Sequence, residues 1–266
     1  MSPRTLLVTG SDGGVGRRIV PDLQAAGFAL RLLDLHHDGP VEGAETVTGS
    51  ITDPAVLRTA LQGCDAVLHL AGASREGPWE EVLEANVHGT RQLLEACVAT
   101  GTRKVVLASS HHATGMTPRS AAGPDGLPGD EAFRPDTYYG WSKTAMESLG
   151  RLYVDRAGLD VVAVRIGTIS ERPANVRALA TWFSPRDTVA LVRAALDPAV
   201  TGWHCVWGIS ANTRRWWSLA AGEAIGYHPA DDAEVFSAQV LRDADPDEVV
   251  DLAGGGFTRF PLGERN

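Results

Sequence analysis

Cysteine is scarce in this chain: three residues, Cys64, Cys97 and Cys205, are spread over 266 positions. Their odd number, their wide spacing and the lack of any CxxC pair argue against a disulfide framework and against a zinc site. We expect the three thiols to be small buried apolar side chains in a reducing compartment.

Long apolar runs and a basic excess are missing as well. No stretch approaches the ~20 apolar residues of a membrane span, and the N-terminal apolar run is too short for a signal peptide. The chain has 24 Lys and Arg against 33 Asp and Glu, a net charge of −9. This balance argues against non-specific binding to nucleic acid or anionic membranes. We therefore expect a cytoplasmic protein that binds neither nucleic acid nor membrane.

Apolar runs of strand length alternate with amphipathic segments of helix length over residues 1–170. The runs that predict buried parallel strands are Thr5–Thr9, Leu30–Leu33, Ala66–Leu70, Lys104–Ala108 and Val161–Ile166. The segments that predict helices are Val15–Ala26, Pro54–Gln62 with Asp53 as its N-cap, Trp79–Thr100 and Tyr139–Ala157. This alternation predicts an α/β fold with a doubly wound parallel sheet of the Rossmann type.

The alternation fails in two places. Residues 117–137 are rich in Pro, Gly and Asp, so we expect a long loop there that is either functional or disordered. After residue 170 the pattern is irregular, with a helix expected near Asp187–Leu196, a strand near Cys205–Trp207 and a helix near Trp216–Ala224. We therefore predict a nucleotide-binding domain over residues 1–170 and a small C-terminal substrate lobe over 171–266 that does not fold independently.

The first predicted strand ends in a glycine-rich turn, GSDGGVG, that opens the first predicted helix. Gly10, Gly13 and Gly16 form a GxxGxxG pattern, which lets the backbone approach a pyrophosphate at the helix N-terminus. A plain glycine-rich turn is the simpler explanation of such a pattern alone. Asp34, eighteen residues after Gly16, ends the second strand, where a carboxylate binds ribose hydroxyls and repels a 2′-phosphate. Together these features favour NAD over NADP.

A tyrosine and a lysine lie four residues apart in the stretch DTYYGWSKTAME. On a helix Tyr139 and Lys143 share a face, whereas Tyr138 points elsewhere. A nearby ammonium favours the phenolate, so the pair predicts a tyrosine that works as a base. By itself the spacing is equally typical of an ordinary amphipathic helix.

The combination of TGxxGxxG, an acidic residue ending the second strand, Ser110 and YxxxK resembles the extended short-chain dehydrogenase/reductase family. The resemblance implies that Tyr139 is the general base, that Lys143 holds the nicotinamide ribose and lowers the pKa of Tyr139, and that Ser110 bonds the reacting oxygen. The cofactor-binding residues that it implies are Gly10, Gly13, Gly14, Val15, Gly16, Asp34, Leu35, Ser50, Ile51, Leu70, Ala71, Gly72, Asn86, Tyr139, Lys143 and Ile169.

The second half of the chain is similar to the uronate dehydrogenases, on VRIGT at 164–168, PANVR at 173–177, TWFS at 181–184 and VWGISAN at 206–212. Those enzymes oxidise C1 of a pyranose uronic acid with NAD to an aldarolactone. The resemblance makes Arg177 the carboxylate clamp, as a guanidinium binds a carboxylate bidentately. Around the sugar it places Ser74, Ser110, His111, His112, Thr168, Arg177 and Phe257.

Two positions depart from that pattern. His111 stands where such enzymes usually have Asn, and Ser50 stands where an Asp usually contacts the adenine. We expect no metal at His111 and His112, because adjacent histidines on an extended segment point apart. One ring should face the sugar and the other the protein.

Two other interpretations stay open. One is a nucleotide-sugar epimerase or dehydratase, or another sugar dehydrogenase of the same family; the other is a non-catalytic NAD-sensing regulator. Retention of both Tyr139 and Lys143 argues against the regulator. The helices at Trp79–Thr100 and Tyr139–Ala157 are expected to form a homo-oligomer face.

Overall fold

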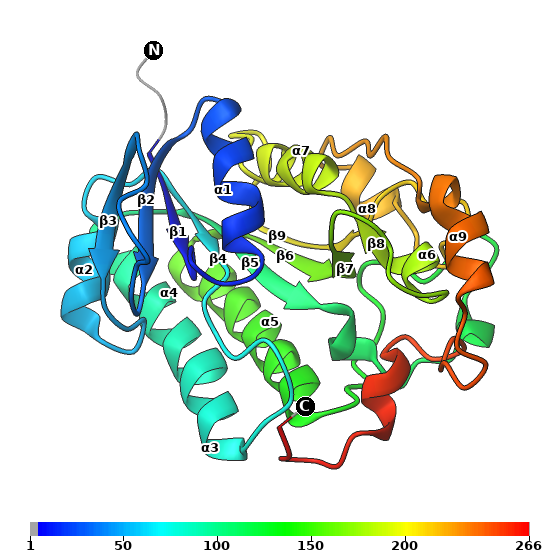
Figure 1. Cartoon of the computed structure of the whole chain (residues 1–266). Coiled ribbons are helices and arrows are strands. Elements are labelled where there is room, and N and C mark those ends of the chain that lie inside the picture. Colours follow the sequence, from blue (N-terminus) through cyan, green and yellow to red (C-terminus); the bar gives the residue numbers. More distant parts are fainter. Residues whose placement is uncertain (1–4, 266) are drawn as a thin grey trace.

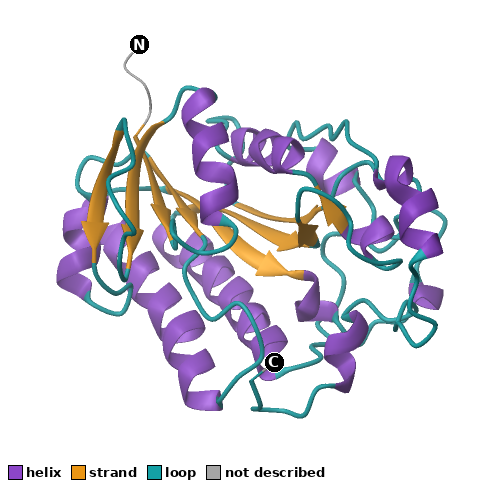
Figure 2. Ribbon diagram, in the orientation of Figure 1, coloured by secondary structure: helices purple, strands orange, loops and turns teal. Residues whose placement is uncertain are grey.

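The computed structural model describes residues 5–265 and contains a seven-stranded parallel sheet covered by helices on both faces (Figures 1 and 2). The strand order is β3-β2-β1-β4-β5-β6-β9. The strands are β1 (Thr5–Thr9), β2 (Ala29–Asp34), β3 (Ala44–Thr48), β4 (Ala66–His69), β5 (Lys104–Ser110), β6 (Asp160–Ile166) and β9 (Trp203–Gly208). The predicted doubly wound Rossmann-type sheet is thereby confirmed.

Alternate side chains of the strands pack into two separate hydrophobic cores, because successive residues of a strand point to opposite faces of the sheet. Leu6 and Val8 of β1 pack with α1 (Gly16–Ala25) and α7 (Pro185–Ala195), whereas Leu7 packs on the other face. That other face is covered by α2 (Pro54–Leu61), α4 (Gly89–Thr100) and α5 (Tyr138–Ala157) (Figure 1). Buried strands with two apolar faces explain why their sequences read as continuous apolar runs.

The predicted strands and helices of residues 1–170 are present, with ends that differ by one or two residues. Asp53 caps α2, since its side chain accepts from the backbone N–H of Ala55 at 2.8 Å. The predicted helix Trp79–Thr100 is divided into α3 (Trp79–Val82), a π-helical turn (Leu83–His88) and α4. Among the strands of the seven-stranded sheet, β3 is the one that was not predicted, because its sequence AETVT is half-exposed and largely polar.

The chain after residue 170 returns to the main sheet. The strand expected near Cys205–Trp207 in the lobe is β9, which pairs in parallel with β6. The helix expected near Trp216–Ala224 is only the short α8 (Ala220–Glu223), and the stacked indoles of Trp216 and Trp217 are buried ahead of it. The division into 1–170 and 171–266 stays a prediction.

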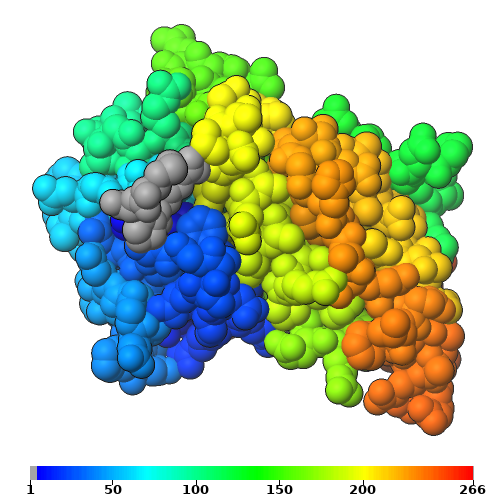
Figure 3. Space-filling model, turned by 90° about the horizontal axis from the view of Figure 1, so that it is seen from above, coloured from blue at the N-terminus to red at the C-terminus, as the bar shows by residue number. Residues whose placement is uncertain are grey.

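The other elements of the second half gather beyond the ends of β5 and β6, on the yellow and orange side of Figure 3. They are the two-stranded parallel sheet of β7 (Thr168–Ile169) and β8 (Trp182–Phe183), α6 (Ala178–Thr181) and α9 (Ser237–Arg242). Short 3-10 helices span His111–Thr114, Arg119–Ala121, Ala233–Phe236 and Gly255–Arg259.

The long loop 117–137 is held to the sheet by Arg165, which also forms a buried ion pair. Arg165 on β6 and Glu147 on α5 lie 2.9 Å apart, with each side chain 2% exposed. The Arg165 guanidinium also donates to the carbonyl of Glu131 in the loop at 2.9 Å. The loop is therefore held close to the carboxyl end of β6, beside the strand ends that carry the predicted site.

Candidate active site

A groove with a volume of about 1020 Å³ lies beyond the carboxyl ends of β1, β2 and β4. In open α/β sheets, ligands bind in the crevice at this edge, beyond the carboxyl ends of the strands. Twelve of the predicted site residues line the groove: Gly10, Gly13, Gly14, Val15, Asp34, Leu35, Ser50, Ile51, Leu70, Ala71, Gly72 and Ser74. The groove is therefore built from the glycine turn and from the loops that follow β2, β3 and β4.

The glycine turn is shaped so that only glycine fits its two ends. Gly10 has φ +71°, and a Cβ there would lie 2.6 Å from the backbone nitrogen of Ala71. A Cβ on Gly16 would lie 2.3 Å from the carbonyl oxygen of Ser11. No side chain caps the start of α1, and the N-terminus of a helix favours an anion. These residues fit the diphosphate of NAD.

Asp34 is fixed at the groove by backbone donors. Its carboxylate accepts from the N–H of Asp12 at 2.8 Å and from that of Leu35 at 2.7 Å. The carboxylate of Asp12, a negative charge inside the glycine turn, is itself paired with the imidazole of His37 at 2.8 Å. The two backbone hydrogen bonds fix the orientation of the Asp34 carboxylate, which suits recognition of the adenosine ribose hydroxyls.

Exchange of Asp34 for Ser is expected to weaken discrimination between NAD and NADP. Loss of a charge-assisted hydrogen bond should lower kcat/KM with NAD about tenfold. Loss of the repulsive charge should raise kcat/KM with NADP by a similar factor. Steady-state kinetics with both cofactors would test this, with Asp38→Ser as the control, because Asp38 pairs with Arg17 and does not line the groove. Unchanged cofactor preference in Asp34→Ser would contradict it.

Tyr139 and Lys143 lie on one face of α5, as predicted. Thr137 caps the helix by accepting from the N–H of Gly140 at 3.0 Å, which places Tyr139 in the first turn. The Lys143 ammonium lies 5.4 Å from the centre of the Tyr139 ring and donates to the carbonyl of Ala108 at 2.9 Å. Tyr138 points away and packs edge-on against Trp79.

The pKa of Tyr139 moves in the direction opposite to the prediction. Burial raises the pKa of Tyr139 to about 12, although its hydrogen bond with Ser110 lowers it. Burial also lowers the pKa of Lys143 to about 8. Desolvation of the phenolate is the largest cause of this shift, and Lys143 is not among its causes, so a lowering of the Tyr139 pKa by Lys143 stays a prediction. A base at this position needs a further positive charge beside it.

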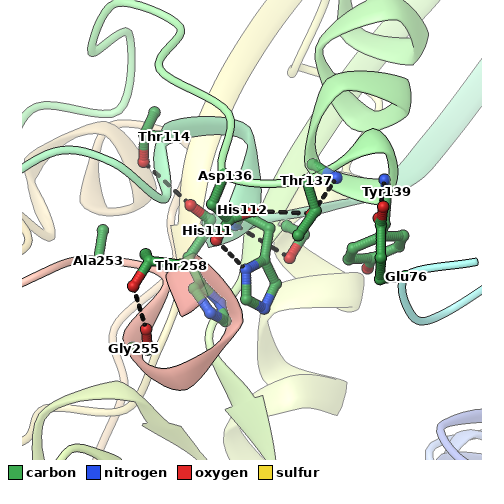
Figure 4. A network of polar contacts seen from close by, with 12 residues as sticks. Glu76, His111, His112, Thr114, Asp136, Thr137, Tyr139, Ala253, Gly255 and Thr258 are labelled. Carbon is green, nitrogen blue, oxygen red and sulfur yellow. Dashed lines mark hydrogen bonds and ion pairs between the residues drawn. The ribbon is translucent and has the colours of Figure 1, made fainter. Parts of the chain in front are cut away.

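The two predicted histidines lie together rather than apart. Residues His111–Thr114 form a 3-10 helix instead of an extended segment, and the two imidazole rings are 4.1 Å apart. The expectation that they point apart is therefore wrong. His112 donates from Nδ1 to the buried carboxylate of Asp136 at 2.6 Å (Figure 4). The same ring stacks on Phe257. This leaves Nε2 of His112 as the acceptor that can meet a sugar hydroxyl.

His111 is a neutral imidazole that faces the predicted carboxylate clamp. Its Nδ1 donates to the carbonyl of Ile166 at 2.7 Å, so Nε2 carries the lone pair and accepts from Arg177 at 2.5 Å. Burial, together with the positive charge of Arg177, holds the pKa of His111 below its usual range. This arrangement explains how a histidine is accommodated where the resembling enzymes have an amide.

Arg177 is a half-buried cation bonded to neutral groups. Its guanidinium donates to His111 and to the carbonyl of Ala253, and no acidic side chain of residues 5–265 forms an ion pair with it. The nearby carboxylate of Glu248 accepts instead from the backbone N–H groups of Val176 and Arg177. Burial lowers the pKa of Arg177 to about 10, so it stays positive at neutral pH. A partly desolvated charge without an acidic partner favours an anionic ligand.

The remaining predicted residues lie around this cluster or behind the groove. The Oγ1 of Thr168 bonds that of Thr181 at 2.9 Å, and Ile169 lines a small apolar cavity behind the groove. Asn86 lies in the π-helical turn and donates to Ala73 and Ser142, while its buried Oδ1 has no partner among the described residues. Their roles stay predictions.

Sequence reasoning missed two acidic residues of this site. Asp136 orients His112, and Glu76 accepts from the backbone N–H of Tyr139 at 2.9 Å (Figure 4). Asp136 directly precedes the N-cap Thr137, but nothing in that position predicts a contact with a histidine 24 residues away. Glu76 lies in a loop with no motif at all.

Acidification is expected to destabilise the fold through the buried histidines. Burial lowers the pKa of His69 from 6.5 to about 3, and it lowers those of His111 and His112 as well. Between pH 6.5 and 3 the unfolded chain binds protons that the native state does not, so stability falls as pH falls. For His69 alone the loss is about 1.4 kcal/mol per pH unit. Thermal unfolding at pH 7.5, 5.5 and 4.5 would show it, and a Tm independent of pH over this range would contradict it.

No helix of residues 5–265 has the length and apolar character needed to cross a membrane. In the same range no three His, Cys, Asp or Glu side chains gather in a way that could hold a metal ion.

The chain belongs to the NAD dependent epimerase/dehydratase family, whose model matches residues 6–176. It is 37% identical to a uronate dehydrogenase of Agrobacterium fabrum over 97% of this chain and 98% of that protein. A crystal structure of uronate dehydrogenase from Agrobacterium tumefaciens, a variant complexed with NAD, superposes with a TM-score of 0.92 at 36% identity, over 98% of this chain and 99% of the other. Glucuronic acid dehydrogenase from Chromohalobacter salexigens gives a TM-score of 0.92 at 34% identity, over 98% of each chain.

Proposed function

We propose that the protein is an NAD-dependent dehydrogenase that oxidises C1 of a hexuronic acid, D-glucuronate or D-galacturonate, to the aldarolactone. The observation that carries the proposal is Arg177, a half-buried guanidinium without an acidic partner, within a cluster that joins it through His111 and His112 to Tyr139. A neutral sugar offers this cation nothing to pair with, whereas a uronate carboxylate accepts two parallel hydrogen bonds from it.

In the proposed reaction, Tyr139 removes the proton from the C1 hydroxyl, and Ser110 donates a hydrogen bond to the same oxygen as negative charge develops on it. NAD, held by the glycine turn and Asp34, supplies the hydride acceptor and the positive charge of its oxidised ring. A cation near Tyr139 lowers the pKa of the Tyr139 phenol, which burial has raised. Lys143, on the same face of α5, contributes to the same effect while it is protonated.

The sugar is oriented by groups on opposite sides of the cluster. Arg177 holds the carboxylate, which sets the ring carbon that faces Tyr139. His112 presents Nε2 to a ring hydroxyl, and Phe257 supports the His112 imidazole by stacking at 4.1 Å. Ser74, Thr168 and His111 complete the proposed contacts with the sugar.

The test is the absorbance of NADH after NAD is mixed with the protein and, separately, with D-glucuronate, D-galacturonate, D-glucose and D-galactose. The proposal expects NADH with at least one uronate and none with the neutral sugars. It also expects the initial rate to rise with pH, because the reaction needs the deprotonated form of Tyr139. Turnover of glucose or galactose as fast as of uronates would rule out the role of Arg177.

We also propose that the protein is a cytoplasmic homo-oligomer that associates through α4 and α5. Val98 on α4 is 45% exposed and Leu152 on α5 is 51% exposed, so each helix presents an apolar side chain to solvent. Light scattering after gel filtration would give the mass, and Val98→Glu with Leu152→Glu should convert an oligomer to monomers. A monomeric wild-type protein would refute this part.

A further inference from the structure

The last part of the described chain, Pro261–Arg265, reaches the cofactor groove; we call it the tail segment. The end marked C in Figure 1 lies beside the loop between β4 and α3. The N–H of Gly263 donates to Glu76 in this loop at 2.8 Å. Arg265 pairs with Glu81 on α3 at 2.5 Å and lines the groove. The tail segment therefore forms part of the groove wall.

Glu76 ties the tail segment to the catalytic helix. Its side chain is buried, at 3% exposure, and both carboxylate oxygens are used by backbone donors. Oε2 accepts from the N–H of Tyr139 and Oε1 accepts from that of Gly263, although these two residues are far apart in the chain. Charge-assisted hydrogen bonds of this kind are stronger than neutral ones, so one buried side chain holds both segments in place.

Most of the charged side chains that line the groove are acidic. The acidic residues that line it are Asp12, Asp34, Glu80, Glu81 and Glu84. Arg265 is the one Lys or Arg among the described lining residues. Arg17 and Arg18 of α1 hydrogen-bond the carbonyls of Asp12 and Gly14 and do not line the groove. A dinucleotide diphosphate must therefore bind among several negative charges with one cationic side chain at hand.

We propose that the tail segment is a cofactor-binding element, in which Arg265 contacts the diphosphate of the dinucleotide and Glu76 positions the segment. The inference rests on the use of NAD stated above. The Arg265–Glu81 pair is exposed, with side chains 72% and 52% accessible, and such pairs are weak. Arg265 exchanges this carboxylate for the diphosphate when the cofactor binds.

The first test is the Kd for NADH of the full chain, from fluorescence titration at low salt without any sugar. Arg265→Gln should raise the Kd about fivefold, as expected for one exposed charge-assisted contact. Arg259→Gln is the matched control, because Arg259 lies in the same part of the chain, bonds the carbonyl of Asp247 and does not line the groove. In Arg265→Gln the affinity for ADP-ribose, which keeps the diphosphate, should fall in parallel with the affinity for NADH. Adenosine should bind the wild-type protein and Arg265→Gln equally.

Glu81→Gln separates a cofactor contact from a merely structural ion pair. If Arg265 binds the diphosphate, removal of its carboxylate partner should lower the Kd for NADH about twofold, because a competing acidic group is gone. If the pair only fixes the tail, Glu81→Gln and Arg265→Gln should weaken binding alike, which would overturn the proposal. An unchanged Kd in Arg265→Gln, or an equal rise in Arg259→Gln, would overturn it as well.

Glu76→Gln tests the anchoring role. The amide keeps the size of the side chain but supplies one acceptor oxygen in place of two. We expect a raised Kd for NADH, and in this background Arg265→Gln should add little, since the tail is no longer held. Full additivity of the two changes would refute the positioning role. These titrations need no uronate, so their failure is distinguishable from a failure of the proposed reaction.

Discussion

Replacement of Tyr139 by Phe is expected to reduce uronate oxidation by a factor of about 10² to 10⁴ while NADH still binds. The change removes only the phenolic oxygen, and the ring keeps its edge-on contact with His112, at 5.7 Å between centres. The Kd for NADH should stay within about twofold of the wild-type value, since the groove lined by the glycine turn is untouched. Initial rates of NADH formation with saturating NAD and uronate would measure the loss.

Tyr138 provides the matched control for that experiment. It is the adjacent tyrosine on the same helix, and it packs against Trp79 instead of facing Ser110. Tyr138→Phe should therefore retain nearly full activity. Comparable loss in both variants would show that the first turn of α5 is disturbed, and retained activity in Tyr139→Phe would rule out Tyr139 as the base.

Exchange of Arg177 for Gln is expected to give the second large effect, a loss of about 10² to 10⁴ in kcat/KM for the uronate. A bidentate pair between a guanidinium and a carboxylate contributes two charge-assisted hydrogen bonds, and both disappear with the charge. The loss should fall mainly on KM, because the carboxylate is bound equally in the ground state and in the transition state. Kinetics over a wide range of uronate concentration would separate the two constants.

The thermal stability of the same variant distinguishes a substrate clamp from a structural arginine. Arg177 is half-buried without an acidic partner, and desolvation lowers its pKa, so its removal relieves a desolvation cost and we expect the Tm to stay level or to rise. A structural arginine that held the carbonyl of Ala253 would instead lower the Tm on exchange. Arg172→Gln serves as the control, because its guanidinium lies over the Phe236 ring and outside the cluster.

Features that depend on nearby residues were predictable from the sequence. The period of apolar residues gave the alternating strands and helices, and the i, i+4 spacing put Tyr139 and Lys143 on one face of α5. The glycine turn was also predictable from a local pattern. Gly10 is required there by its φ of +71° and by the backbone of Ala71, which a Cβ would meet at 2.6 Å. Asp53 as the cap of α2 is a further local signal that the structure confirms.

Predictions failed where environment outweighed local pattern. The histidines were expected on an extended segment, but the chain turns into a 3-10 helix directly after β5 and brings their rings side by side. The pKa of Tyr139 was expected to fall, but its burial by surrounding elements raises it. In both cases the deciding quantity is the packing around the residue, which its neighbours in the chain do not encode.

The sequence by itself determined the class of fold, the glycine turn, the acidic residue at the end of β2 and the shared face of Tyr139 and Lys143. These follow from backbone geometry and side-chain period, which act over a few residues. Tertiary structure alone decided that Arg177 meets His111, 66 residues away, and that Glu76 joins Tyr139 to Gly263, 187 residues from Glu76. It also placed β9 in the main sheet. Contacts of this kind arise when distant segments pack together to bury apolar surface, so no local pattern specifies which polar groups meet.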